Sequence, residues 1–165
     1  MNKYDFDVLE NEFNSHTFLT DNDIKYDVKF KPTGYIFNSN AVWTFYCYEF
    51  SIEVIVNPTG RLPPLDTKIP LTVAAIFLDF FQDKEKSVLY TCETKDGKAV
   101  ARLRKFDTWF QQFNEDIFIK IDNAFYDHEL KVTYYNSLII KQLNPYKNEI
   151  IEAFENLFGG FEENK

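Results

Sequence analysis

The sequence predicts an α+β fold: a mainly antiparallel sheet with about three helices packed on one face, in a single domain that spans residues 1–165. Three observations lead to this prediction. Strand-like segments come first and are joined by short turns. Three later segments space their apolar residues as a helix does, and no unit of roughly 20 to 50 residues repeats along the chain.

The first clear element is a β-hairpin over residues 16–30. Two runs of β-forming residues flank Asp21, Asn22 and Asp23, which tolerate the backbone of a tight turn. Residues 41–56 then predict a longer strand whose second half alternates between apolar and polar side chains. The side chains expected to face the core are Tyr48, Phe50, Ile52, Val54 and Val56.

Residues 57–66 form a connector that holds three prolines and Arg61. A helix is expected to start near Asp66 or Thr67, with Pro70 tolerated because it falls in the first turn. Its apolar stripe consists of Ile69, Val73, Ile76, Phe77, Phe80 and Phe81.

Strands and helices alternate in the second half of the chain. A strand at 87–94 is followed by a turn at 95–98, and a second helix then runs to Phe113. Two further strands are expected at 116–122 and 129–141. The core-facing residues of the second helix are Ala99, Leu103, Phe106, Phe110 and Phe113.

The last helix has clear start and stop signals. Asn144 is expected to cap it, Pro145 suits its first position, and Gly159 stands where a left-handed C-terminal cap would lie. Residues 159–165 are expected to form a frayed tail.

The composition is rich in aromatic residues and acidic. There are 18 Phe, 10 Tyr and 2 Trp against 5 Gly, which predicts a Phe-rich core or, alternatively, an aromatic groove or partner surface. The net charge of −8 opposes binding to nucleic-acid phosphates or to an anionic membrane. It permits a basic partner protein.

Cysteine usage and the N-terminal residues both predict a cytoplasmic protein. Cys47 and Cys92 each lie inside an apolar run, as buried reduced thiols do. Residues 1–13 carry acids where a signal peptide needs basic and then apolar residues. No apolar run approaches the roughly 18 residues of a membrane span.

Motifs for metal binding or catalysis are weak. His16 and His128 stand alone and are expected at the surface, so we expect no metal and no cofactor. Cys92 precedes a helix N-terminus, which lowers the pKa of a thiol, but structural burial is the favoured interpretation. Residues 88–113 resemble the acyl-CoA site of acetyltransferases superficially, without its glycine-rich loop.

Two of the three arginines, Arg102 and Arg104, lie on the second predicted helix. Helical spacing places Lys98, Arg102, Lys105 and Trp109 on one face, with Arg104 apart and within reach of Asp107 and Thr108. A guanidinium holds carboxylate or phosphate with two parallel hydrogen bonds and stacks on rings. These residues are candidates for binding an anion or a partner; alternatively, the arginines pair with the protein's own carboxylates.

The run FLDFFQDKEKSVLYTCETKDGKAVARLRKFDTWF, residues 77–110, contains FF, YxC and RxRxFxxW elements. It resembles a family of small uncharacterised bacterial proteins, and the likeness extends over most of the chain. The resemblance implies a domain of unknown function without an assigned activity, cofactor or catalytic residue. It makes Arg102, Arg104, Phe106 and Trp109 resemble family-marking positions, as a packing motif also would.

The sequence favours a non-enzymatic protein-binding module, similar to immunity or antitoxin proteins whose acidic surfaces neutralise basic effectors. Self-association is a further expectation. The alternative is a small enzyme or binding protein for an anionic metabolite or nucleotide. In that case Arg102 and Arg104 would bind the charge, while Trp109 or a tyrosine would stack on the ligand.

Overall fold

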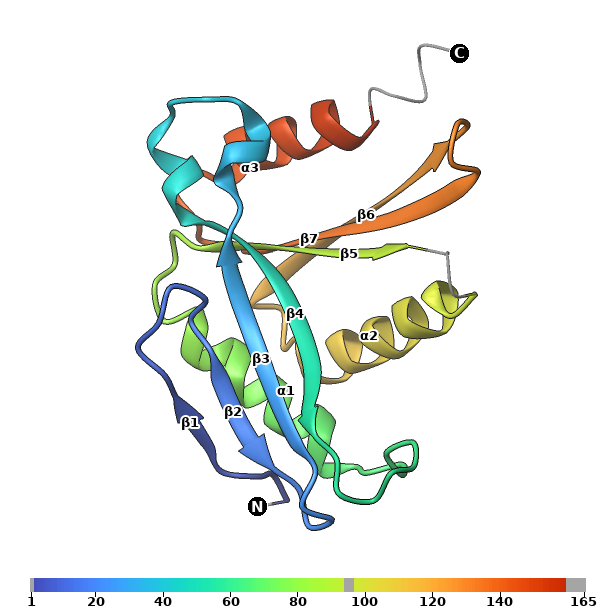
Figure 1. Cartoon of the computed structure of the whole chain (residues 1–165). Coiled ribbons are helices and arrows are strands. Elements are labelled where there is room, and N and C mark those ends of the chain that lie inside the picture. Colours follow the sequence, from blue (N-terminus) through green and yellow to red (C-terminus); the bar gives the residue numbers. More distant parts are fainter. Residues whose placement is uncertain (1, 94–96, 160–165) are drawn as a thin grey trace. The chain divides into compact units, whose positions relative to one another are not determined.

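The computed structural model describes residues 2–93 and 97–159. Its seven strands form one mostly antiparallel sheet in the order β1-β2-β3-β4-β5-β7-β6 (Figure 1). With the three α-helices of the described ranges, this confirms the α+β class. Half of the turn predicted at 95–98 and all but the first residue of the tail predicted at 159–165 lie outside the described residues.

Contacts within the chain divide it into two compact units. Unit 1 comprises residues 1–31 and 50–82, and unit 2 comprises residues 32–49 and 83–165. The chain passes from one unit to the other within β3 (Lys25–Pro32) and within β4 (Cys47–Val56). The single domain expected from the chain length therefore stays a prediction.

Unit 1 begins with three antiparallel strands, β1 (Phe6–Val8), β2 (His16–Leu19) and β3. The β2–β3 hairpin confirms the one predicted at 16–30. Its turn is closed by a hydrogen bond of 2.9 Å from the Thr20 amide to the Ile24 carbonyl, and Asp23 adopts a left-handed φ of 59°. β1 has only three residues, too few for an alternating pattern.

An aromatic cluster joins these strands to α1 (Lys68–Phe80), which lies against one face of them (Figure 1). Phe30 of β3 is fully buried, and its ring stacks on that of Phe80 with centroids 3.8 Å apart. Phe77 meets the same ring edge-on at 5.5 Å, and Phe50 of β4 approaches it at 5.9 Å. Such packing buries a large apolar area with few side chains. It also confirms the predicted stripe of α1.

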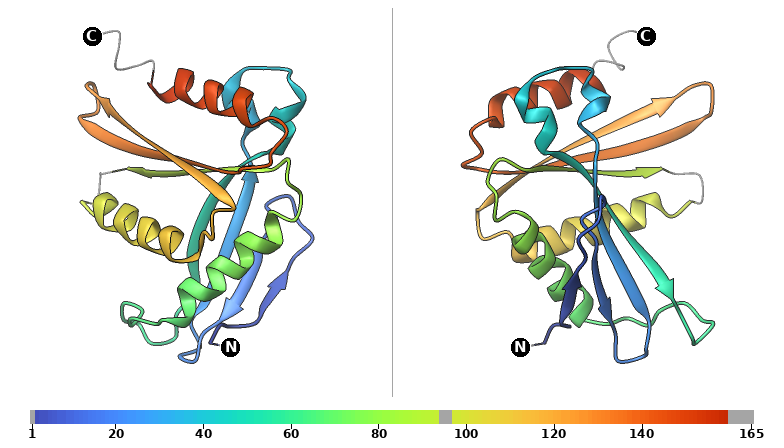
Figure 2. Two further views of the ribbon diagram at one scale, coloured as in Figure 1. Left: turned by 180° about the vertical axis from the view of Figure 1, so that it is seen from behind. Right: turned by 60° about the vertical axis from the view of Figure 1, so that its left-hand side comes forward.

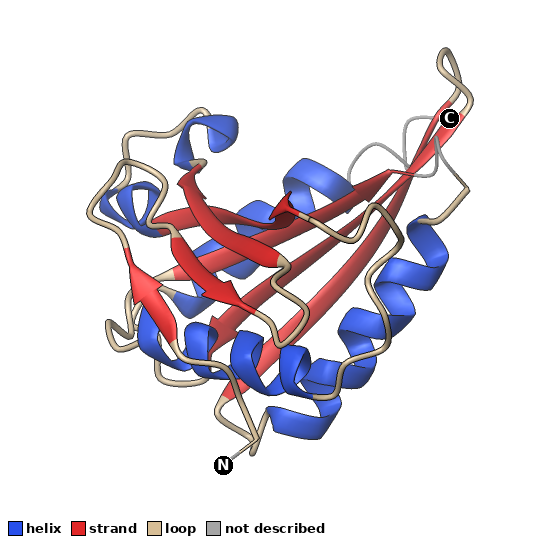
Figure 3. Ribbon diagram, turned by 60° about the horizontal axis from the view of Figure 1, so that its bottom comes forward, coloured by secondary structure: helices blue, strands red, loops and turns tan. Residues whose placement is uncertain are grey.

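Unit 2 contains β5 (Ser87–Glu93), β6 (Phe118–Asp127) and β7 (Val132–Lys141). β7 pairs antiparallel with both of the others, and β6 and β7 form a hairpin longer than the two predicted strands suggested (Figure 3). The start of β4 pairs in parallel with β5, from Cys47 opposite Ser87 to Glu49 opposite Leu89.

Within unit 2, α2 (Ala99–Phe113) and α3 (Lys147–Phe154) lie on opposite faces of the sheet (Figure 2). Ile150 and Phe154 of α3 share a core with Leu89, Leu138 and Ile140. On the other face, the Phe106 ring of α2 lies 4.6 Å from that of Tyr90. The prediction of helices on one face is therefore wrong. The continuous buried run in β7, residues 136–140, reflects a strand covered on both sides.

The first half of the strand predicted at 41–56 is also wrong. The chain forms two short 3₁₀ helices, η1 (Gly34–Phe37) and η2 (Val42–Tyr46), before β4 begins. In η2 both the amide and the hydroxyl of Thr44 donate to the Ala41 carbonyl, at 3.1 and 2.7 Å. This tight turn buries Trp43 and Thr44 and leaves Val42 and Phe45 exposed. At the far end of β4, Val54 and Val56 are exposed instead of facing the core.

The last helix starts later than expected. Asn144 accepts the Tyr146 amide at 2.8 Å, and its side-chain nitrogen donates to the carbonyls of Glu85 and Lys86. The side chain therefore fixes the turn that precedes α3, and the helix itself begins at Lys147. It continues into a π-helical turn over Glu155–Gly159.

Gly34 predicts a sharp steric effect on stability. A Cβ at this position would lie 1.8 Å from the Thr44 carbonyl oxygen, so Gly34→Ala should lower the free energy of unfolding by about 3 kcal/mol. The control is Gly60→Ala, where φ is +65° but nothing lies within 4 Å. At Gly60, backbone strain alone should lower the free energy of unfolding by about 1 kcal/mol. Equal losses for the two variants in urea unfolding would contradict the close approach.

Candidate functional site

Three of the four residues predicted to share one face of the second helix, Arg102, Lys105 and Trp109, lie within α2, and Lys98 stands at its N-cap. Lys98, Arg102 and Lys105 are exposed, and Trp109 is half-buried. The Lys105 Nζ lies 5.2 Å from the centre of the Trp109 ring, a cation–π contact. We call this set of Lys98, Arg102, Lys105 and Trp109 the α2 basic stripe.

The α2 basic stripe runs along the β5 side of the helix. The Arg102 charge acts on the Tyr90 hydroxyl of β5. On the other flank of α2, Asp107 forms an ion pair with Lys120 of β6. Burial, followed by a hydrogen bond with Cys92, raises the pKa of Tyr90, and Arg102 opposes this rise. The stripe therefore borders a neutral, protonated phenol.

Arg104 lies apart from the stripe, as predicted. Its carbonyl accepts the Thr108 hydroxyl at 2.9 Å, which is a contact within the helix backbone. Asp107, the expected partner of its side chain, is engaged by Lys120 instead. Among the described residues no ion pair is formed by the exposed Arg104 guanidinium.

Lys120 was not singled out from the sequence. Its side chain is only 6% exposed and lies between Asp107 of α2 and Asp122 of β6. Asp122 also accepts the Ser137 hydroxyl at 2.6 Å. A buried ammonium needs such carboxylates to offset its desolvation, so this chain of contacts fixes α2 on the sheet. The sequence did contain a sign of this buried ion pair, because Lys120 and Asp122 stand two apart in an apolar strand.

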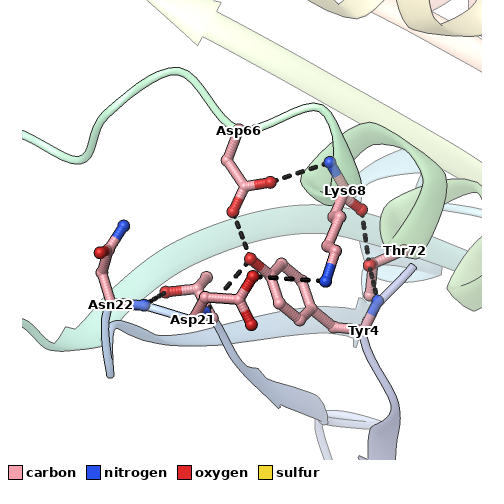
Figure 4. Close-up of polar contacts among 7 residues, drawn as sticks. Tyr4, Asp21, Asn22, Asp66, Lys68 and Thr72 are labelled. Atoms are coloured by element: carbon pink, nitrogen blue, oxygen red, sulfur yellow. Dashed lines mark hydrogen bonds and ion pairs between the residues drawn. The ribbon is translucent and has the colours of Figure 1, made fainter. Parts of the chain in front are cut away.

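A second polar cluster holds the N-terminal segment against the start of α1 (Figure 4). The Tyr4 hydroxyl donates to Asp66 at 2.5 Å and accepts the Asp21 amide at 3.2 Å. The Tyr4 amide donates to the Thr72 hydroxyl, while the Lys68 ammonium lies 4.9 Å from the centre of the Tyr4 ring. Burial, followed by the Asp66 hydrogen bond, raises the pKa of Tyr4 to about 12.

Asp66 has a second role in the same cluster. Its other carboxylate oxygen accepts the Lys68 amide at 2.9 Å, which satisfies a backbone donor at the start of α1. This contact confirms the helix start predicted near Asp66 or Thr67.

The prediction of a surface position is wrong for His16, which is 2% exposed. Its ring lies between β2 and α1, with Nδ1 2.8 Å from the Asn14 carbonyl oxygen and Nε2 3.2 Å from the Asp79 carboxylate. These partners come from distant or irregular segments, so the local sequence could not reveal the burial. His128 is exposed, as predicted, and packs edge-on against Tyr126.

Both cysteines are free and buried, as predicted. Burial raises the pKa of Cys47 to about 11, opposed by a hydrogen bond from Ser87, so its thiolate is scarce near neutral pH. Across residues 2–93 and 97–159, no group of three or more His, Cys, Asp or Glu side chains is placed to hold a metal ion. No helix in those ranges is long and apolar enough to cross a bilayer.

Comparison with known families identifies the chain. Residues 65–156 match the model of a family described as "Family of unknown function (DUF6169)". The chain belongs to this family. The result confirms the expected domain of unknown function. The DUF6169 match includes the α2 basic stripe and Lys120. It begins after Tyr4, His16 and the strands of the N-terminal half.

Two further comparisons give one distant structural likeness. No curated protein matches the sequence. One similar solved structure is that of MesI, a CoA-dependent acyl-homoserine lactone synthase. The likeness covers 93% of this chain and 72% of that one, with 16% identity and a TM-score of 0.37. A likeness of this size assigns no activity and no functional residue to the DUF6169 chain.

The Tyr4 cluster predicts alkaline sensitivity. A phenol held at a pKa of about 12 when folded and near 10 when unfolded stabilises the fold below about pH 10. That contribution is lost as pH rises from about 10 to about 12. Tyr4→Phe should cost about 2 kcal/mol at neutral pH and should flatten the alkaline fall in unfolding free energy. A parallel fall in variant and wild type would contradict this role of Tyr4.

Proposed function

We propose that this DUF6169 protein binds a phosphate-bearing anionic ligand, such as a nucleotide-type metabolite, on the α2 basic stripe. The observation that carries the proposal is the concentration of exposed cations on α2 beside an aromatic ring, in a chain whose net charge is −8. The guanidinium of Arg102 matches a phosphate with two parallel hydrogen bonds, and Lys105 supplies a second charge.

The surroundings of the stripe support an anionic ligand over a structural role. Asp107, the acid on α2, is already engaged by Lys120, so the helix does not neutralise the stripe through it. Arg104 adds a further exposed cation on the adjacent side. Trp109 belongs to the stripe and Tyr90 borders it. A planar ring such as a nucleobase gains about 1–3 kcal/mol from aromatic stacking.

The test is titration calorimetry with pyrophosphate, ATP and coenzyme A, three probes that share phosphates and differ in their rings. Arg102→Gln should weaken binding about tenfold and Lys105→Gln about fivefold. Binding should also weaken between about 50 mM and about 200 mM salt. The matched control is Lys84→Gln, an exposed lysine outside α2. No heat with any probe, or equal losses for all three variants, would refute the proposal.

A second candidate is the non-enzymatic protein-binding module expected from the sequence, similar to immunity or antitoxin proteins. It is favoured by apolar side chains exposed in η1 and η2: Tyr35 at 81%, Phe45 at 75% and Val42 at 56%. Large aromatic rings in solvent are typical anchors of protein interfaces. The acidic net charge suits a basic partner.

The double variant Tyr35→Ser/Phe45→Ser distinguishes this candidate. A basic protein that copurifies in fixed stoichiometry from the native host should be lost from the variant, while the thermal midpoint stays within about 2 °C of wild type. The Leu143→Ser variant changes another exposed apolar side chain and should retain the partner. Retention of the partner by both variants would count against η1 and η2 as the interface.

A further inference from the structure

Unit 1 contains an open pocket of about 540 Å³ beside β1 and β2. His16 contacts α1 through Asp79, and strand alternation therefore turns Thr17 and Leu19 of β2 the other way. The pocket is lined by Lys3, Tyr4, Asp5, Asp7, Thr17, Phe18, Leu19 and Lys25. It lies outside the family match and outside the proposed α2 site.

Two polar side chains at this face, Thr17 and Asp27, each have an oxygen that forms no hydrogen bond within residues 2–93 and 97–159. Thr17 is 5% exposed and lines the pocket, yet its hydroxyl forms no hydrogen bond with any described residue. Asp27 lies directly opposite Thr17 on β3, and its Oδ1 is buried without a partner in the same part of the chain. Buried polar groups are normally paired. The Thr17 hydroxyl is therefore available to a molecule in the pocket.

The pocket also carries charges of both signs. Asp5 and Asp7 are exposed carboxylates, and Lys25 is a half-buried ammonium. Across the described ranges none of these three forms an ion pair, while Lys3 lies 5.6 Å from the centre of the Phe6 ring. Opposite charges that are left unpaired around one cavity match a ligand that itself carries both charges.

Strand register fixes the spacing of these groups. Asp7 is opposite Thr17, and Leu19 is opposite Lys25. The two pairs are separated by two residues along β2, which is about 7 Å. A lysine side chain can span much of that distance toward the Thr17 hydroxyl. Leu19, which is 51% exposed, adds an apolar surface between the carboxylates and the ammonium.

We propose that this pocket binds a zwitterionic α-amino acid with an apolar side chain. The ligand ammonium contacts Asp7 and donates to the Thr17 hydroxyl, and the ligand carboxylate contacts Lys25. The apolar side chain packs on Leu19. This ligand class differs from the phosphate-bearing ligand of the α2 basic stripe, so either site can be present without the other.

The experiment is an NMR titration of the full-length protein with L-leucine and two derivatives that each lack one charge. N-acetyl-L-leucine lacks the ammonium, and L-leucine amide lacks the carboxylate. L-Leucine should shift the backbone signals of Asp7, Thr17 and Lys25, and each derivative should bind at least about tenfold more weakly. No shifts with leucine, or equal binding of either derivative, would overturn the proposal.

Variants test the assignment of each charge. Asp7→Asn should weaken leucine binding about tenfold and leave the binding of N-acetyl-L-leucine unchanged. Lys25→Met should also weaken leucine binding about tenfold and leave the binding of L-leucine amide unchanged. Glu12→Gln and Lys84→Met, exposed charges outside the pocket, are the matched controls and should bind leucine as wild type does. Equal weakening of leucine binding in the controls and the pocket variants would overturn the assignment.

Discussion

The stacking of aromatic rings around Phe30 is the interaction on which unit 1 depends. Phe30 contacts rings from β4 and α1 and lies edge-on to His16 of β2, so a single side chain joins three strands to the helix. α1 can cover only one face of the strands. The polar residues that alternate with this cluster are consequently left on the other face, where Thr17 and Asp27 lie. The same packing fixes the start of α1, where Asp66 and Lys68 meet Tyr4.

Charge is distributed unevenly in a chain that is acidic as a whole. α2 concentrates cations on its outer surface, and its acid is used internally by Lys120. Exposed charges are screened beyond about 8–10 Å. The electrostatic energy of an anion close to the stripe therefore depends more on Arg102 and Lys105 than on acids elsewhere in the chain. The net charge of −8 therefore opposes binding to a broad anionic surface more strongly than binding to a small anion.

Helical periodicity carried most of the information that the sequence could give. It predicted α1, α2 and the membership of the basic stripe, because residues three or four apart on a helix are neighbours. Residues 41–46 were predicted as a strand because aromatic residues favour strands, yet here a 3₁₀ turn buries Trp43 and Thr44 and leaves Val42 and Phe45 exposed. The burial of His16, the contacts of Lys120 and the pocket at Thr17 depend on strand register and helix docking. A single sequence does not encode those pairings locally.

The interleaved composition of the two units has a consequence for how the chain can be divided. Residues 32–49 belong to unit 2 but are flanked on both sides by segments of unit 1. No single cleavage of the backbone can separate the units, and a fragment that ends at residue 82 would leave Trp43 and Cys47 without Leu89, Leu138 and Phe154. Since Cys47 meets Ser87 across forty positions, unit 2 cannot close before the intervening chain is synthesised. Chain connectivity consequently couples the folding of the two units.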